Sequence, residues 1–335
     1  MAGSVPDTPL IPHGRNTPLS APSPSRQTSS LRLDDVALEI RQIEVDRTSI
    51  GLVRELQEVG MGIGILPLEL RDHMTRHLQE ENQPSYMWKQ AFQEDPDTLP
   101  GNFPNWATLA HFREKAQDCF NEGHDESSWN VEVYHRLLMR IFRKTGHLVE
   151  NVDFMACASA RPHESYLPQP LGPKMVDFCL FDTSRSDDAA RRELARTTPT
   201  LSVNHTDFAP LQLRPIVLGI TTAPPSGDLE ATRLQVGEWH RAQWRFLRSI
   251  VMQKIAAVEP NEATLHRLTD ETLGKLDYIP GIITRDRVVL WTELEFGSTQ
   301  TIMKSYQIVA GLRHVARWAD DFYMPWFRSN CCRSQ

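Results

Sequence analysis

The sequence has no apolar run long enough to cross a bilayer and no secretory signal. Its longest uncharged apolar stretch, Val59 to Leu68, contains three glycines and a proline and falls well short of the ~20 residues that a membrane-spanning helix needs. The chain does not open with a charged segment followed by an apolar one, which is the pattern of a secretory signal. We therefore expect no membrane contact and an intracellular protein, in the nucleus or the cytoplasm.

Cysteines are few, and acidic residues outnumber basic ones. The five cysteines include no C-x-x-C pair, which suits reduced thiols in an intracellular protein. The net charge is −7, from 36 Lys and Arg against 43 Asp and Glu. This balance disfavours an intrinsically basic nucleic-acid binder, because phosphate contacts usually need an excess of Lys and Arg. It does not exclude a local basic groove.

Composition and periodicity divide the chain into four segments. Residues 1–33 are rich in Ser, Pro and Thr, so they cannot bury enough surface to offset the entropy of ordering, and we predict a disordered tail. Residues 34–125 show helical spacing of apolar residues and predict a helical extension. Residues 126–328 hold the predicted core, and residues 329–335 are expected to form a flexible C-terminus.

A glycine-rich stretch, Gly60 to Pro67, lies within the helical extension. A dinucleotide-binding fingerprint follows a strand and opens a helix, whereas this stretch follows a helical pattern and meets a proline. We interpret it as a turn that leads into a helix at about 67–80, with another helix at about 106–120.

The order of predicted elements in the core is informative. An apolar stripe predicts a helix from Trp129 to Phe142, and an apolar run at 215–222 predicts a buried strand. The other expected elements are extended segments at 151–159 and 174–181, a polar excursion at 182–200, a helix at 229–258, a hairpin at 278–291 around Arg285-Asp286, and a final helix at 299–322. This order predicts an α/β fold with a mixed sheet flanked by helices.

Several stretches, taken together and in order, resemble the PD-(D/E)XK nuclease-like superfamily, and more narrowly its fungal nuclease-like group. The resemblance covers roughly residues 34–328. The stretches that carry it include Ser128-Trp129-Asn130-Val131-Glu132-Val133, Lys174-Met175-Val176-Asp177-Phe178, Ser202-Val203-Asn204-His205-Thr206-Asp207, Gln235, Trp239, Ala242-Gln243-Trp244, Phe296-Gly297-Ser298-Thr299, Ala310-Gly311-Leu312-Arg313 and Tyr323-Met324-Pro325-Trp326-Phe327. The resemblance implies a PD-(D/E)XK-like core and a site built for phosphodiester hydrolysis.

Hydrolysis at such a site uses a divalent metal, which polarises the phosphate and lowers the pKa of the attacking water. Mg²⁺ or Mn²⁺ is held by hard oxygen ligands, above all carboxylates. By resemblance, Asp177 is the central metal ligand, Glu132 is an accessory carboxylate from the first core helix, and Gln235 is a polar residue added by the following helix. These three positions are filled as the family expects.

Two further positions depart from the family pattern. Residues i and i+2 of a strand share a face, and Thr221 and Ala223 stand where the family has a second carboxylate and a lysine. A hydroxyl is a poor Mg²⁺ ligand, and a methyl group cannot stabilise a developing negative charge. By analogy with the loss of one oxyanion donor, the missing lysine alone raises the barrier by about 3 kcal/mol. We predict an impaired metal site that binds Mg²⁺ or Mn²⁺ weakly or not at all.

A relocated carboxylate is the alternative to an impaired site. Asp228, Glu230 and Glu238 follow the strand closely, and Glu238 comes three residues after Gln235, on nearly the same helical face. Asp177 has a plainer interpretation as an outward-facing strand residue, but an acid within an apolar strand favours a site.

Other polar and aromatic residues have structural interpretations. Arg241, Arg245 and Arg248 recur at helical spacing and favour a solvated helix face, with a phosphate track as the alternative. We expect His205 to hydrogen-bond locally in a turn. A packed anchor, rather than a partner surface, is the expected role of the C-terminal aromatic residues Trp318, Phe322, Tyr323, Trp326 and Phe327.

Three functions stay open on these grounds, because fold resemblance alone cannot choose among them. The first is a pseudo-nuclease with an impaired metal site that binds nucleic acid or another protein. The second is an active Mg- or Mn-dependent phosphodiesterase with a relocated carboxylate. The third is a scaffold recruited to act on a small molecule in a fungal secondary metabolic pathway, which the apolar rim of Thr221 and Ala223 suits. The sequence does not determine the oligomeric state.

Overall fold

The computed structural model describes residues 51–80, 84–93, 99, 103–144, 147–148, 151–167, 176–223, 228–284, 287–290 and 294–332. All of them belong to one compact unit of the chain. The predicted tail at 1–33, the start of the helical extension, Lys174-Met175 of the motif and the turn at Arg285-Asp286 lie outside the described residues.

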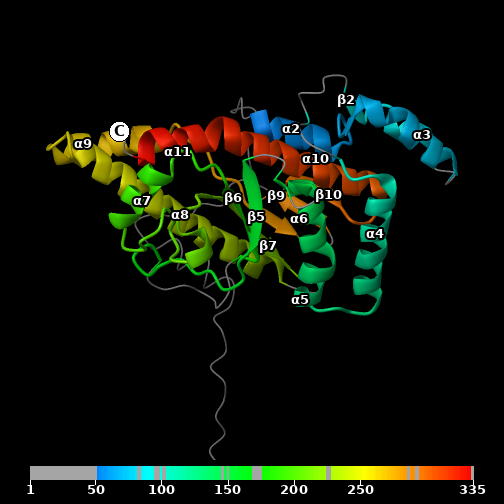
Figure 1. Cartoon of the computed structure of the whole chain (residues 1–335), viewed down its shortest axis with the longest axis horizontal. Coiled ribbons are helices and arrows are strands. Elements are labelled where there is room, and N and C mark those ends of the chain that lie inside the picture. Colours follow the sequence, from blue (N-terminus) through cyan, green and yellow to red (C-terminus); the bar gives the residue numbers. More distant parts are fainter. Residues whose placement is uncertain are drawn as a thin grey trace, which may run out of the picture. The chain divides into compact units, whose positions relative to one another are not determined.

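A six-stranded mixed sheet forms the centre of this unit (Figure 1). Its order is β10-β9-β8-β7-β6-β5, in which β7 and β8 are parallel and the other neighbours are antiparallel. The strands are β5 (Val152–Ala156), β6 (Phe178–Asp182), β7 (Ile216–Thr222), β8 (Ile282–Thr284), β9 (Arg287–Leu290) and β10 (Leu294–Ser298). The predicted α/β fold with a mixed sheet is confirmed, and β10 is an edge strand that the sequence pattern did not predict.

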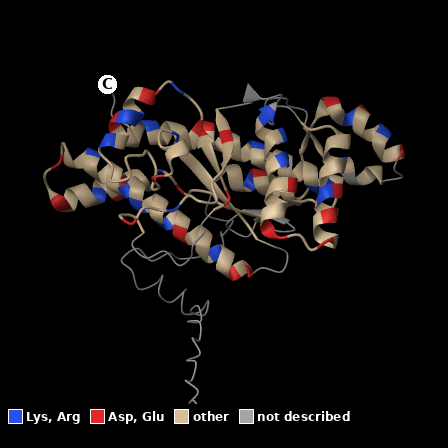
Figure 2. Ribbon diagram, turned by 60° about the horizontal axis from the view of Figure 1, so that its bottom comes forward, with Lys and Arg blue, Asp and Glu red and all other residues tan. Residues whose placement is uncertain are grey.

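The central strands are buried along their whole length. Every residue of β6 and β7 is buried, which matches their near-continuous apolar sequences, since a strand covered on both faces has no need to alternate. In Figure 2 the charged residues lie mainly on the helices, and the central strands are nearly free of them.

Helices cover both faces of the sheet. On one face, Phe142 of α6 (His135–Phe142) lies against Phe154 of β5, whose ring centroid is 6.3 Å from that of Phe178. On the other face, Trp239 of α8 (Leu229–Ala256) packs on Gly219, where an added Cβ would lie 3.1 Å from the indole Nε1. Phe178 pairs with the residue that follows Gly219, and side chains of successive strand residues alternate between faces. The helices α6 and α8 therefore pack on opposite faces of the sheet at β6 and β7.

The helices before the sheet begin with α2 (Gly51–Gly60) and a glycine turn. Gly62 and Gly64 in this turn have φ of 76° and 60°, which glycine adopts without strain. The chain continues through β1 (Leu66–Pro67) into α3 (Arg71–Glu80), β2 (Phe92–Gln93) and α4 (Trp106–Asn121). The predicted turn is confirmed.

A helical hairpin leads from these segments into the sheet (Figure 1). It consists of α4 and of α5 (Glu126–Trp129), which continues through a π-helical turn (Asn130–Tyr134) into α6. Further described elements include the β3–β4 pair (Arg143–Lys144 and His147–Leu148) and α9 (Glu262–Leu273). None of the helices in the described part of the chain is long and apolar enough to cross a membrane.

The C-terminal helices form a packed anchor. α10 (Ile302–Trp318) continues through a π-helical turn (Ala319–Tyr323) into α11 (Met324–Cys331), well past the predicted end at residue 322. Cys331 and Cys332 are buried, although they fall in the segment expected to be flexible. Phe322 is 66 % exposed, whereas the other predicted anchor residues are buried, namely Trp318, Tyr323, Trp326 and Phe327.

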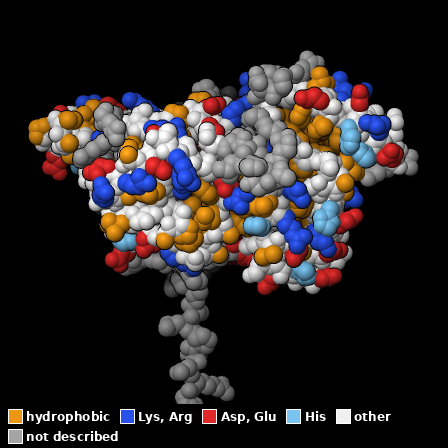
Figure 3. Space-filling model, viewed as in Figure 1, with side chains coloured by type: hydrophobic (Ala, Val, Ile, Leu, Met, Phe, Trp, Pro, Cys, Tyr) orange, Lys and Arg blue, Asp and Glu red, His pale blue; other side chains and the backbone are white. Residues whose placement is uncertain are grey.

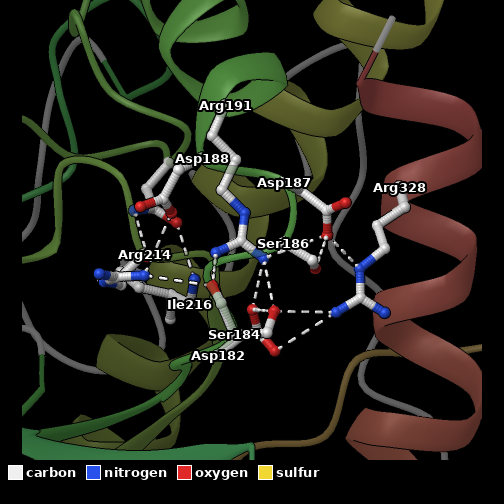
Figure 4. Close-up of polar contacts among 10 residues, drawn as sticks. Asp182, Ser184, Ser186, Asp187, Asp188, Arg191, Arg214, Ile216 and Arg328 are labelled. Atoms are coloured by element: carbon white, nitrogen blue, oxygen red, sulfur yellow. Dashed lines mark hydrogen bonds and ion pairs between the residues drawn. The ribbon is translucent and has the colours of Figure 1, made fainter. Parts of the chain in front are cut away.

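A buried ion network stands at the end of β6 (Figure 4). Asp182 and Arg191 of α7 (Asp188–Arg196) have fully buried side chains and form an ion pair. Ser184 Oγ donates a hydrogen bond to the same carboxylate at 2.5 Å. Arg328 of α11 pairs with Asp187 at 2.6 Å and lies 3.7 Å from the Asp182 carboxylate. The network joins β6, α7 and α11 at the end of β6 that lies away from Asp177.

Candidate functional site

The neighbouring strands β6 and β7 bring their predicted site residues to the same side of the sheet, where β6 begins and β7 ends. Asp177 directly precedes β6, and Thr221–Ala223 stand at the end of the antiparallel strand β7. Regular pairing begins at Phe178, later than the predicted start at 174. The backbone N–H of Asp177 still donates to the Ile220 carbonyl at 2.8 Å, so the ladder holds this residue in place.

The carboxylate of Asp177 is the centre of a buried polar cluster. Asp177 is 2 % exposed. Asn130 Nδ2 donates to its Oδ1 at 2.7 Å, and the backbone N–H of Thr222 donates to its Oδ2 at 2.8 Å. The Thr222 hydroxyl donates in turn to Glu126 Oε1 at 3.2 Å. Two carboxylates thus converge on Thr222, and we call Asp177, Thr222, Glu126 and Asn130 the Asp177 cluster.

The first core helix supplies two members of this cluster. Asp125 caps α5 by accepting the Ser128 N–H at 2.8 Å, so the helix begins with Glu126 at the sheet edge. Glu126 and Asn130 are four residues apart and therefore share a helical face. Glu126 was not among the predicted site residues, although its four-residue spacing from Asn130 indicates a shared face once the side chain of Asn130 is known to reach the site.

Glu132, the predicted accessory carboxylate, lies on another side of the same helix. It pairs with Arg136 at 2.8 Å, and burial together with the charge of Glu132 raises the pKa of Cys119 on α4. Two residues correspond to about half a helical turn, so Glu132 and Asn130 lie on nearly opposite faces. The structure does not bring Glu132 and Asp177 together.

The remaining predicted positions surround the end of β7. Thr221 is 1 % exposed and Ala223 is 5 % exposed. The Ala223 N–H donates to the Thr284 carbonyl of β8 at 2.8 Å, so β8 holds the buried Ala223 at the end of β7. Gln235 is half-buried on α8.

The acids considered as relocated carboxylates lie at the N-cap of α8 and within its first ten residues. Asp228 is the N-cap and accepts the backbone N–H of Glu230 at 2.9 Å. Glu230 forms an ion pair with Arg233, and Glu238 is buried. Glu126 shares Thr222 with Asp177 as a hydrogen-bonding partner.

Two buried histidines lie on the α8 side of the sheet. The ring of His205 meets Trp239 edge-on with centroids 4.3 Å apart, and its Nε2 has no hydrogen-bonding partner. His240 Nε2 lies 3.2 Å from the Pro280 carbonyl. Burial, and secondarily the charge of His240, lowers the pKa of His205 to about 3, and burial lowers the pKa of His240 to about 4. Both are neutral at physiological pH, and His205 packs on an aromatic ring rather than hydrogen-bonding in a turn.

The arginines of α8 do not form the solvated face that their spacing predicted. Arg241 is buried. Arg245 donates to the Tyr166 carbonyl at 3.2 Å, and Arg248 pairs with Asp270 of α9. The side chains of Arg245 and Arg248 contact other parts of the protein because the segment before residue 168 and α9 pack against this helix.

The Asp177 cluster fits a hard divalent cation in the type of its donors. It offers two carboxylates, a hydroxyl and the amide oxygen of Asn130, and oxygen ligands are those that Mg²⁺ prefers. The Asn130 Oδ1 atom is buried and has no hydrogen-bonding partner, so this oxygen is available. Within the described ranges, however, His, Cys, Asp and Glu side chains nowhere gather in a group of three that could hold a metal. The cluster is therefore short of carboxylates.

Comparison with known proteins agrees with this arrangement. No curated protein and no solved structure matches the chain. The sequence pattern of the PD-(D/E)XK nuclease superfamily matches residues 73–324, a range that includes the helical hairpin, the sheet, the Asp177 cluster, α8 and α10. With the mixed sheet, its flanking helices and a match over well more than half of the chain, this protein belongs to the PD-(D/E)XK nuclease superfamily.

Proposed function

We propose that this protein is a superfamily member with an impaired metal site, which binds its ligand without cleaving a phosphodiester. The observation that carries the proposal is Ala223. Its side chain is buried at the end of β7, where the family places the lysine that stabilises charge on the phosphate. A methyl group cannot supply that stabilisation, and preorganised charge of this kind is usually the largest single contribution to such catalysis.

The hydrogen bonds of Asp177 support the same conclusion. Both oxygens of its carboxylate already accept hydrogen bonds, from Asn130 and from Thr222. These hydrogen bonds use one lone pair on each oxygen, and the cluster has one acid fewer than a three-carboxylate site. If Mg²⁺ or Mn²⁺ binds, Asp177, Glu126 and Asn130 would hold it, and it would polarise a phosphate and lower the pKa of a water.

Cleavage of plasmid and single-stranded DNA in Mn²⁺ and Mg²⁺ tests the proposal. Wild-type protein and the Asp177→Asn variant are expected to give the same background rate. Circular dichroism and a urea unfolding curve establish that both are folded. Metal-dependent cleavage that the wild type shows and Asp177→Asn lacks would refute the proposal.

An active phosphodiesterase is the second candidate, and two features of the Asp177 cluster favour it. Glu126 brings a second carboxylate to Thr222, and the Asn130 Oδ1 atom is available to a cation. Glu126→Gln and Glu132→Gln form a matched pair of variants, because both acids come from the same helical segment. If the site is active, Glu126→Gln abolishes the metal-dependent cleavage and Glu132→Gln retains it, since Glu132 lies away from Asp177.

A further inference from the structure

A groove separate from the Asp177 cluster lies between α4 and α6. Its volume is about 730 Å³, within the range of about 300–1,000 Å³ that is usual for small-molecule sites. None of the residues that line it belongs to the Asp177 cluster. The groove is large enough for a metabolite-sized ligand.

The lining of this groove is basic, in contrast to the negative charge of the whole chain. Its described residues include Arg136, Arg140, Arg143, His111 and His135, and none of them is acidic. On the face shown in Figure 3, Lys, Arg and His side chains gather where Figure 1 places α4 and α6. The groove is thus a local exception to the net charge of −7.

Two of the arginines are held in place by contacts outside the groove lining. Arg143 donates to both oxygens of Asp153 at 2.6 and 2.8 Å, and its guanidinium lies over the Phe154 ring at 4.6 Å. Arg136 pairs with Glu132 at 2.8 Å. Such contacts preorganise a guanidinium, so it loses less conformational entropy when a ligand binds.

The third arginine is more open to a ligand. Arg140 is exposed, and no ion pair joins it to another described residue. The electrostatic effect of its neighbours is visible at His135, because burial, followed by the charges of Arg143 and Arg136, lowers the pKa of that histidine. Arg140 therefore supplies the positive charge that no described carboxylate balances, while Arg136 and Arg143 are each paired with a carboxylate.

The floor of the groove is apolar. Phe112 of α4 is buried and Met139 of α6 is half-buried, and both line it. Guanidinium groups bind phosphate oxygens through two parallel hydrogen bonds, whereas an apolar floor suits a ring or a hydrocarbon. A ligand that carries both groups matches both parts of the groove.

We propose that the α4–α6 groove binds a small organic phosphate, whose phosphate contacts Arg136, Arg140 and Arg143 and whose ring or hydrocarbon lies on Phe112 and Met139. This proposal rests on the ligand-binding part of the proposed function and names a ligand class for it. Glu132 acquires a role here, because it positions Arg136 in the groove.

Isothermal titration with ATP at low salt tests the proposal, with pyrophosphate as the ligand that lacks a ring. We expect saturable binding of ATP, weaker binding of pyrophosphate, and a Kd for ATP about tenfold or more higher in Arg140→Ala, the usual effect of losing a hydrogen bond to a charged group. Arg140→Lys keeps the positive charge but loses the paired N–H donors of the guanidinium, and it should give an intermediate Kd for ATP. The matched control is Arg267→Ala, which removes an exposed arginine of α9 and should leave the Kd unchanged.

Three results would overturn the proposal. The first is the absence of saturable ATP binding, and the second is an equal Kd for ATP in Arg140→Ala and Arg267→Ala. The third is that the protein binds a ten-nucleotide single strand but not ATP, and that Arg140→Ala weakens the binding of this strand. The last result would assign the groove to nucleic acid instead. Cleavage of DNA that Asp177→Asn abolishes would refute the proposed function but not the groove, because Asp177→Asn should leave ATP binding unchanged.

Discussion

The buried histidines His205 and His240 make the protein sensitive to mild acid. Burial holds their pKa values at about 3 and about 4 in the folded state, whereas an unfolded histidine titrates near pH 6.5. Between these values the unfolded chain binds more protons than the folded one, so stability rises with pH and falls as the pH is lowered below about 6.5. His135 adds to this trend, because its pKa is also lowered.

The size of this loss depends mainly on the protonation of histidine in the unfolded chain. At pH 5.5 an unfolded histidine is about nine-tenths protonated while a buried one stays neutral, so each histidine lowers the free energy of unfolding by about 1.4 kcal/mol relative to pH 7.5. His205 and His240 together should cost about 3 kcal/mol, a large share of the 5–15 kcal/mol that is typical of folded proteins.

Urea unfolding at pH 7.5, 6.5 and 5.5 measures this loss. In His205→Gln and in His240→Gln, the difference between pH 7.5 and pH 5.5 should shrink by about 1.4 kcal/mol, whatever the variant does to stability at pH 7.5. His266→Gln is the control, because the His266 side chain is 47 % exposed. The reasoning is wrong if the wild type loses less than about 1 kcal/mol between these pH values, or if the two buried-histidine variants lose as much as the wild type.

Three further predictions concern the packing of the fold. Arg191→Met removes the fully buried ion-pair partner of the Asp182 carboxylate and should lower the free energy of unfolding by about 3–5 kcal/mol, with partial recovery when Asp182→Asn is added; urea unfolding of the single and double variants measures both effects. Gly219→Ala places a Cβ 2.7 Å from Val176 Cγ1 and should cost about 1–3 kcal/mol, whereas Gly51→Ala meets no atom within 4 Å and should be close to neutral by the same measurement. All five cysteines are buried, so a thiol reagent should react slowly with the native protein and count five thiols in urea; fast native reaction of several thiols would contradict the packing.

Most of the core elements were predictable because their signals are local. β7 and α8 occur close to the predicted 215–222 and 229–258, since a continuous apolar run and a 3.6-residue periodicity are properties of short segments. β10 was missed for the same reason. Its pairing shifts register between Glu295 and Gly297, and such a bulge breaks the alternation that identifies a strand.

The candidate site was predictable only in part. Asp177, Thr221 and Ala223 gather at one sheet edge, as antiparallel neighbours must when their strands pair in this register. Their roles in metal binding stay predictions. The sequence could not show which carboxylate of the first core helix reaches the site. Glu126 and Glu132 lie six residues apart on the same helical segment, and only the rotation of that helix decides which of them faces the strand ends.

By itself, the sequence determined the fold class, the superfamily and the absence of a lysine at position 223, because these depend on residue identity and local periodicity. Only the tertiary structure decided that Glu126, not Glu132, shares Thr222 with Asp177, and that the arginines of α8 contact other parts of the protein while those of α6 line a groove. The physical reason is that the direction of a side chain depends on helix rotation and on what packs against each face. Residues that are distant in the sequence but adjacent in the fold determine both the rotation of a helix and the packing on each of its faces.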